Sequence, residues 1–407
     1  SSTVCNNSMM SEGLTSSLHE NADLGQIIRS LMVETQHIQD EDPSLRITEM
    51  DFLINDLKHL LLQERNTYSL ARQSSARRRQ LESLRNLIDS LDSHMQTMRR
   101  IMSCAHLCKS CLLYRILLRR SKDAIQSKLQ SWLDEQCVRE LSAIIGPDHV
   151  DEDAQTNALC SFETIVCKGY DASIQEAILL CGLVTKLASL LDANTVSWRV
   201  QKRAALAIKA LLVFNKDIFV SLVLMANVVK KILALMDTES DENVLFLLSV
   251  LKSMLSVGHT IVVDEIYSHD GVPKIVNLLI DCKLEALQFA AFDCILELVY
   301  NGRIEVLSQV FQCNVVKNLV MLRSSYKETT RNSASCSSQD KDHGNHRDTY
   351  PFVNALSDFA TQFAIGIGLR EREKQASRQV FLRQIKEIIQ DDVEVANISI
   401  KVLWGPR

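Results

Sequence analysis

Apolar residues recur at helical spacing along most of the chain, and the clearest example lies between Asp270 and Val299. Its first segment, 271–279, reads Gly-Val-Pro-Lys-Ile-Val-Asn-Leu-Leu. Gly271 and Pro273 mark a helix start there, because proline is tolerated in the first helical turn. The second segment, 287–299, places apolar residues three and four positions apart, which predicts a helix buried on most sides. Such a pair of helices cannot bury its apolar faces alone, so the pattern predicts neighbouring copies.

The same pattern recurs at a nearly constant interval. With Gly271 as the anchor of one copy, similar segments start at anchors near Cys137, Gly182, Asn227 and Asn314, at spacings of 43 to 45 residues. Long helices are expected after the anchors, and short helices before the next ones: 154–166, 200–212, 243–255 and 287–299 for the long set, 174–180, 218–224, 261–267 and 304–311 for the short set. The predicted unit is therefore short helix, helix, long helix.

A three-helix unit with this period resembles the armadillo-repeat family. The pieces that carry the resemblance are the segment 271–279 and Leu-Gln-Phe-Ala-Ala-Phe-Asp-Cys-Ile-Leu at 287–296. The fold class expected is all-α, an α-solenoid of about five armadillo repeats preceded by an N-terminal helical bundle. The resemblance implies a concave groove lined by the third helices, in which a partner protein would be held.

The C-terminal part carries a narrower resemblance. Phe-Ala-Ile-Gly-Ile-Gly-Leu-Arg-Glu-Arg-Glu-Lys at 363–374, a helix with Phe-Leu-Arg-Gln-Ile-Lys at 381–386, and Val-Leu-Trp-Gly at 402–405 are similar to the tail of a group of plant armadillo proteins related to the U-box armadillo proteins. The chain departs from that group at Ile365 and Ile367, where acidic residues are usual. The compact ubiquitin-ligase module of the U-box relatives is not expected, because residues 1–130 hold few Pro and Gly and are predicted to be helical.

Five segments are expected along the chain. Residues 1–23 are polar and predicted to be disordered, 24–123 form the helical bundle that caps the first repeat, and 124–405 form the solenoid. Within the solenoid, 324–349 has almost no apolar residues and is predicted to be a disordered insertion, and 370–404 supplies capping helices.

Composition restricts the compartment. The chain has no run of 18 apolar residues, so no transmembrane helix is expected, and its first residues show no signal peptide. Most of the 12 cysteines fall inside apolar helical patterns, which favours buried, reduced thiols. These features predict a cytoplasmic protein, with the nucleus as the alternative.

Charge is unevenly distributed. Residues 65–128 hold fourteen Lys or Arg against four acids, whereas the whole chain has a net charge of −5. A candidate basic patch follows: Arg77, Arg78, Arg79, Arg99, Arg100, Arg119 and Arg120, spread over three predicted helices. It could contact an anionic membrane, nucleic acid or an acidic protein, although few aromatic residues lie among the arginines and a solvated helix face is the simpler reading.

No catalytic or cofactor-binding pattern is found. Gly366 and Gly368 form no phosphate loop because no strand precedes them, and no His-Glu-x-x-His, Gly-x-Ser-x-Gly or paired Cys-x-x-Cys motif occurs. Cys104, Cys108 and Cys111 would share one helix face from which His106 points away, which favours core over zinc. The sequence therefore predicts a non-enzymatic protein with no cofactor, no metal and no small-molecule substrate.

Groove contacts were placed by matching the long helices to nuclear-import members of the armadillo family, which hold peptides with a Trp and, four residues on, an Asn. The matched pairs are Cys160/Thr164, Leu206/Ala210, Ser249/Ser253 and Asp293/Glu297, and none contains Trp or Asn. Binding of a basic import signal is therefore disfavoured. Asp293 and Glu297 lie one turn apart and would favour a basic group, although a solvated acidic face explains them equally well.

Three hypotheses follow from these observations. The first is a scaffold that binds a partner protein along the groove, through Thr164, Leu206, Ala210, Ser249, Ser253, Asp293 and Glu297. The second is an adaptor or ligase-related component of the ubiquitin pathway. The third is binding of an anionic surface or nucleic acid by the basic N-terminal bundle.

Overall fold

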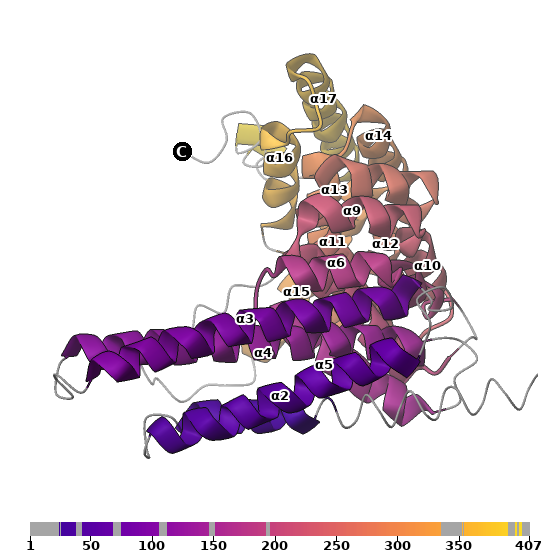
Figure 1. Ribbon diagram of the computed structural model, residues 1–407. Helices are drawn as coiled ribbons and strands as arrows, with labels where there is room; N and C mark the ends of the chain where they lie inside the picture. Colours follow the sequence, from indigo (N-terminus) through magenta and orange to yellow (C-terminus); the bar gives the residue numbers. More distant parts are fainter. Residues whose placement is uncertain are drawn as a thin grey trace, which may run out of the picture. The chain divides into compact units, whose positions relative to one another are not determined.

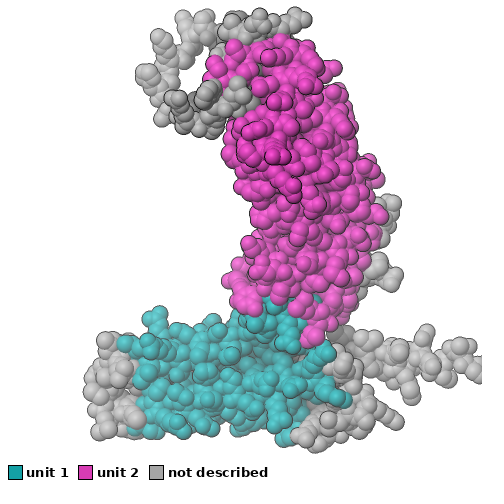
Figure 2. Space-filling model, turned by 90° about the horizontal axis from the view of Figure 1, so that it is seen from above, with its two compact units in different colours: residues 1–140, 171–178 teal, residues 141–170, 179–407 magenta. Residues whose placement is uncertain are grey.

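The structure is a computed structural model. It describes helices and turns over residues 24, 26–37, 43–67, 75–105, 112–145, 151–192, 196–334, 352, 354–389, 395–396 and 399–400, and no strand occurs in these ranges. Figure 1 labels the helices, and Figure 2 colours two compact units, residues 1–140 with 171–178 (unit 1) and residues 141–170 with 179–407 (unit 2). The prediction of an all-α fold is confirmed.

Unit 1 is built from long helices: the segment 26–37, α2 (Pro43–Thr67), α3 (Ser75–Ala105) and most of α4 (Leu112–Ile144). Lys58 pairs with Asp92, and Arg99 pairs with Asp51. The residue number on α3 rises as that on α2 falls, so these two helices are antiparallel. Their apolar faces and those of the other two helices form one core: Ile28, Leu31, Ile47, Met50, Ile54, Leu57, Leu84, Leu87, Ile88, Leu91, Met95, Met98, Leu118, Ile125, Leu129 and Trp132.

The end of this bundle differs from the prediction. We expected a boundary at 123/124 and a repeat anchor near Cys137, but α4 runs without a break from Leu112 to Ile144 through both positions. Its 33 residues contain neither Gly nor Pro, so nothing in the local sequence ends the helix there. The first unit instead extends to Glu140.

Unit 2 is a stack of three-helix repeats, and by itself it is elongated along the stacking direction (Figure 2). The third helices of successive repeats are α5 (Glu152–Cys167), α8 (Trp198–Phe214), the first half of α11 (Asp241–Ser268), α13 (Glu285–Asn301) and α16 (Ala355–Ile365). Each contacts the next one in this order. The other helices that complete the repeats are α7 (Leu183–Ser189), α9 (Lys216–Met225), α10 (Val228–Leu235), α12 (Gly271–Asp281), α14 (Ile304–Gln312), α15 (Val315–Ala334) and α17 (Glu371–Ile388), while α6 (Ala172–Leu180) crosses the division between the units.

A left-handed residue starts the second helix of each repeat. Gly182, Asn227, Asp270 and Asn314 have φ between 54° and 59°, and each donates its backbone N–H to the carbonyl three residues before it. This corrects the predicted register by one residue, because Asp270, not Gly271, is left-handed. Gly271 is the first helical residue, and a Cβ there would lie 2.8 Å from Leu233 Cδ1 and 3.0 Å from the backbone oxygen of Ile266.

Two lysines, each four residues after a left-handed position, tie their repeat to the one before it. Lys231 donates to the carbonyl of Ala188 at 3.0 Å and pairs with Asp192 at 2.8 Å. Lys274 repeats the arrangement with the carbonyl of Leu233 and with Asp237. A cation placed on the carbonyl end of a helix is favoured by the helix dipole, so these lysines stabilise the stacking of repeats.

The helix α11 is continuous in outline but bent inside. His259 has φ 46° and ψ −129°, which separates a third helix from the first helix of the next repeat. Among the described residues, α11 is the one helix that is long and apolar enough to cross a membrane. The number rises to three if the bent pairs α6 with α7 and α9 with α10 are each counted as one span. Half of the most apolar 18-residue stretch of α11 is buried inside the protein, and its apolar residues, such as Leu247 and Val263, pack in the repeat core.

We expect His259→Gly to raise the free energy of unfolding by about 1 kcal/mol. The backbone at His259 lies in a region that glycine favours, and a non-glycine residue held there costs about 1–3 kcal/mol. Part of that gain is lost because glycine makes the unfolded chain more flexible. Urea denaturation would measure the change. Asn215→Gly, at the equivalent bend of the preceding repeat where the backbone is extended, is the control and should not stabilise.

The C-terminal part differs from the prediction at one point and otherwise follows it. We expected a disordered insertion from 324 to 349, but α15 continues to Ala334, because residues 324–334 contain neither Gly nor Pro. The rest of that segment, like most of 390–407, lies outside the described residues. Phe359, Phe363 and Phe381 are fully buried, and with Phe311 they form a ring cluster with centroids 5.7–6.4 Å apart.

Candidate functional site

The third helices α5, α8, α11 and α13 present one exposed face each, and we call these faces together the groove surface. On α8 the unburied residues that follow Trp198 recur at helical spacing: Arg199, Lys202, Arg203, Leu206, Lys209 and Val213. The opposite side of α8 is buried against α5 and α11. The groove surface is therefore the side of each third helix that the repeat core leaves uncovered.

The residues predicted as groove contacts are placed differently by the structure. Thr164 and Ser249 are exposed, and Leu206, Ser253, Asp293 and Glu297 are half-buried. The three hydroxyls each donate to a carbonyl of their own helix, at 2.7–2.9 Å. Ala210 is only 8% exposed and packs in the repeat core, so it offers no contact surface.

Asp293 is already paired. Lys252 of the neighbouring α11 donates a hydrogen bond to Asp293 Oδ2, and this bond raises the pKa of Lys252 above its usual value. The raised pKa keeps Lys252 charged at neutral pH, so the Asp293 carboxylate is paired with a cation of the same groove surface. Glu297 accepts a hydrogen bond from Asn301 Nδ2 at 3.2 Å. The acidic pair expected to attract a basic group thus retains one unneutralised carboxylate, that of Glu297.

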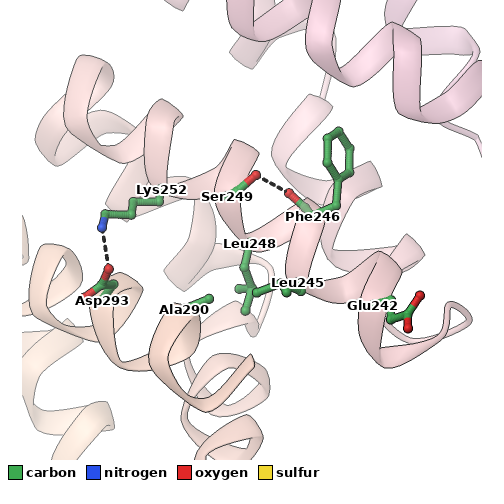
Figure 3. A pocket seen from close by; sticks show the side chains of 8 residues that line it. All are labelled: Glu242, Leu245, Phe246, Leu248, Ser249, Lys252, Ala290 and Asp293. Atoms are coloured by element: carbon green, nitrogen blue, oxygen red, sulfur yellow. Dashed lines mark hydrogen bonds and ion pairs between the residues drawn. The ribbon is translucent and has the colours of Figure 1, made fainter. Parts of the chain in front are cut away.

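A hollow of about 400 Å³ lies beside this ion pair, between α11 and α13. Figure 3 shows Leu245, Leu248 and Ala290 at its centre, the Lys252–Asp293 pair at one side and Glu242 at the other. Phe246 lies on its rim, where its ring meets Trp198 edge-on at 5.9 Å between centroids. The hollow combines an apolar floor with charged edges, which is the composition of a site for a side chain of a partner.

Several of these groups were missed by the sequence analysis. Lys202, Leu245 and Phe246 lie one turn before the matched positions on their helices, on the same exposed face. Lys202 Nζ lies 5.1 Å from the centroid of the Phe246 ring, a cation–π contact between adjacent repeats. A search of the full exposed face of each long helix, rather than of two ladder positions, would have found all three.

The candidate basic patch is divided by the structure. Arg77–Arg79 and Arg99–Arg100 lie on one helix, α3, about 30 Å apart at 1.5 Å per residue, rather than on two of three helices. Ser83 of α3 donates to Glu135 of α4 at 3.0 Å. Arg119 and Arg120 lie in the first half of α4. Arg78 and Arg79 are exposed at the other end. The side chain of Arg77 lies outside the described part.

The described cysteines are all free thiols. In the described ranges, no three His, Cys, Asp or Glu residues lie together in a way that could hold a metal ion. Cys108 and Cys111 lie outside those ranges. Cys294 is fully buried next to the carbonyl of Leu248, and burial raises the pKa of its thiol to about 12.

We expect Cys294 to resist alkylation in the folded protein. The thiolate is the reactive form, and at about pH 8 a thiol with so high a pKa stays protonated as well as covered. Cys167 is exposed and serves as an internal comparison. Peptide mass mapping after brief maleimide treatment should show modified Cys167 and unmodified Cys294, with both modified in urea. Equal rates for both thiols in the native protein would contradict the buried placement.

Comparisons with known proteins come from structure alone. No family model matches the chain, and no curated protein matches it by sequence. Solved structures that are similar include a designed armadillo repeat protein in complex with the peptide (KR)4, at 18% identity over 66% of this chain and 98% of that one, with a TM-score of 0.45. Computationally designed armadillo repeat proteins for modular peptide recognition match at 17% identity over 67% and 99%, with a TM-score of 0.44. An engineered protein matches 94% of this chain and 93% of its own, at 15% identity and a TM-score of 0.45.

These likenesses are too distant to transfer a function. The class follows from the helices themselves: left-handed turns and three-helix layers at a period of 43–45 residues define an α-solenoid of armadillo repeats. A plant origin and a relationship to U-box proteins stay predictions from the sequence.

Proposed function

We propose that this protein is a non-enzymatic scaffold of the cytoplasm or nucleus that holds an extended segment of another protein along the groove surface. The observation that carries the proposal is the unbroken row of third helices α5, α8, α11 and α13, each in contact with the next. Repeat proteins use such extended faces for binding. The hollow of about 400 Å³ between α11 and α13 supplies a place for an anchoring side chain.

Blocking the groove tests this function. Ser249→Arg with Ser253→Arg would place two long side chains across the surface of α11, where Ser249 is exposed and Ser253 is half-buried. Proximity labelling in cells, or capture from lysate, should lose the partners of the wild-type chain. The matched control is Ser221→Arg with Ser268→Arg, two exposed serines on first helices of the repeats.

The control variant should retain the partners that the groove variant loses, and both should melt within a few degrees of the wild type, since surface substitutions change stability by about 0.5 kcal/mol or less. An unchanged partner set for the groove variant would refute binding at this surface.

A second candidate function rests on unit 1, where Arg100 of α3 and Arg119 and Arg120 of α4 are exposed. This cluster would bind an anionic membrane surface. Arg99 is excluded because it is paired with Asp51. In co-sedimentation with phosphatidylserine vesicles, Arg100→Glu, Arg119→Glu and Arg120→Glu together should weaken binding about 100-fold or more, at about 1 kcal/mol per basic residue. Arg78→Glu, Arg79→Glu and Arg85→Glu, also exposed in unit 1, form the control, and equal losses in both triple variants would contradict a localised cluster.

A further inference from the structure

The third helices α5, α8 and α13 each carry charged side chains of only one sign, and the first half of α11 carries mainly acids. The helix α8 has four cations and no acid, α5 and α13 have three acids each and no cation, and the first half of α11 has two acids and one lysine. Because the exposed face of α8 includes all four cations, this charge lies on the groove surface.

Ion pairs between neighbouring helices neutralise only part of it. Arg199 pairs with Asp153 at 2.6 Å and Arg203 lies 3.7 Å from Glu163, so two cations of α8 are matched by acids of α5. The pair Lys252–Asp293 removes one acid of α13.

Charged groups without an ion-pair partner remain on both α8 and α13. In the described part of the chain, neither Lys202 nor Lys209 of α8 forms an ion pair, and the same is true of Glu285 and Glu297 of α13. Glu242, in the first turn of α11, lines the hollow and adds to the acidic side. The groove surface is thus positive on α8 and negative on α13 after its internal pairs are formed.

An apolar zone separates the two ends. The Phe246 ring lies under Lys202 Nζ, and Leu245 and Ala290 line the hollow next to it (Figure 3). From α8 through α11 to α13 there are two helix spacings of about 8–10 Å each. An extended chain that advances about 3.3 Å per residue crosses this distance in about five or six residues.

We propose that the groove selects an extended segment with carboxylates at one end, a large apolar side chain in the middle and cations at the other end, and that charge fixes its orientation. The acidic end lies on α8 near Lys202 and Lys209, the apolar side chain enters the hollow of α11 and α13, and the basic end lies on α13 near Glu297, one turn after Asp293. This inference rests on the proposed function, because it specifies the partner for the same surface.

Two synthetic peptides of about nine residues test the charge order. One is the block peptide Asp-Asp-Asp-Ala-Phe-Ala-Lys-Lys-Lys, and the other, with the same composition, alternates its charges as Asp-Lys-Asp-Ala-Phe-Ala-Lys-Asp-Lys. Fluorescence anisotropy with the full chain at low salt should show the block peptide binding about tenfold more tightly. Each exposed ion pair contributes little by itself, and a few such pairs together account for a tenfold change in affinity. Lys202→Glu with Lys209→Glu should remove that preference, while Lys216→Glu with Lys230→Glu, exposed on α9 and α10, should keep it.

A photoreactive group at the acidic end of the block peptide tests the orientation. Crosslinks on the exposed face of α8 are expected, and crosslinks on α13 would overturn the proposed direction. Equal affinity of the two peptides, with both weakened by Phe246→Ala, would refute the charge order while leaving groove binding intact. Crosslinks confined to other faces of unit 2 would refute the groove itself. No binding of either peptide at millimolar concentration would also overturn the proposed selectivity.

Discussion

Phe381→Ala is expected to lower the free energy of unfolding of unit 2 by about 3–5 kcal/mol, the range for a buried phenylalanine truncated in a packed core. Phe381 of α17 is 0% exposed, and its ring lies 5.7 Å from that of Phe359 and 5.8 Å from that of Phe363 between centroids. The substitution would leave a cavity between α16 and α17, where the aromatic cluster holds α17 on the last layer of the stack. Urea denaturation followed by circular dichroism would measure the change.

The neighbouring residue provides the control for this prediction. Val380 is 37% exposed, so Val380→Ala should cost about 1 kcal/mol or less. Hydrogen exchange should report the loss of protection in α16 and α17 first, because stacked repeats unfold locally from an end. If Phe381→Ala and Val380→Ala were equally mild, the aromatic cluster would not be the core of the last layer.

Gly368→Ala is expected to lower the free energy of unfolding by about 3 kcal/mol, because the cost of overpacking adds to the cost of lost hydrogen bonds. It should also detach the loop between α16 and α17 from the end of α13. A Cβ on Gly368 would lie 2.2 Å from the carbonyl oxygen of Gly302 and 2.6 Å from that of Asn301. Both are backbone atoms at the end of α13, so no side chain can rotate away. The backbone N–H groups of Ile367 and Gly368, which donate to the carbonyl of Tyr300 at 2.8 and 3.3 Å, would move with the loop.

Ile367→Ala distinguishes backbone contact from side-chain packing in this loop. Ile367 is 59% exposed, so its truncation should change stability by about 0.5 kcal/mol or less. Differential scanning calorimetry of the three proteins would give the comparison. A Gly368→Ala protein as stable as the wild type would mean that the loop does not lie against α13 in solution.

The repeat architecture was predictable because its signals are local. A left-handed residue followed by buried positions one, two, five and six residues later is visible in the sequence at Gly182 and Asn227. At 270–271 the sequence misled by one residue, because glycine usually takes the left-handed position. There Asp270 takes it, and a Cβ on Gly271 would meet the side chains of Ile266 and Leu233 at 2.8 Å and the backbone oxygen of Ile266 at 3.0 Å.

Features that join distant residues could not be predicted in this way. The role of Gly368 depends on the backbone of Gly302, which lies in another repeat. The charge of the groove surface was mispredicted for the same reason. Lys252 of one repeat pairs with Asp293 of the next repeat. At Cys137 the apolar spacing matched an anchor, but without Gly, Pro or Asn the chain stayed helical through it.

Distances between third helices test the central claim, that successive layers stack into one continuous groove surface. Spin labels on an unnatural amino acid at Thr164, Ser253 and Glu297, taken in pairs, would be measured by double electron–electron resonance. Because the labels on α5, α11 and α13 are separated by known numbers of layers, each layer should add about 8–10 Å. The account predicts that the Thr164–Glu297 distance exceeds the Thr164–Ser253 distance by one layer; a Thr164–Glu297 distance equal to or shorter than Thr164–Ser253 would contradict it.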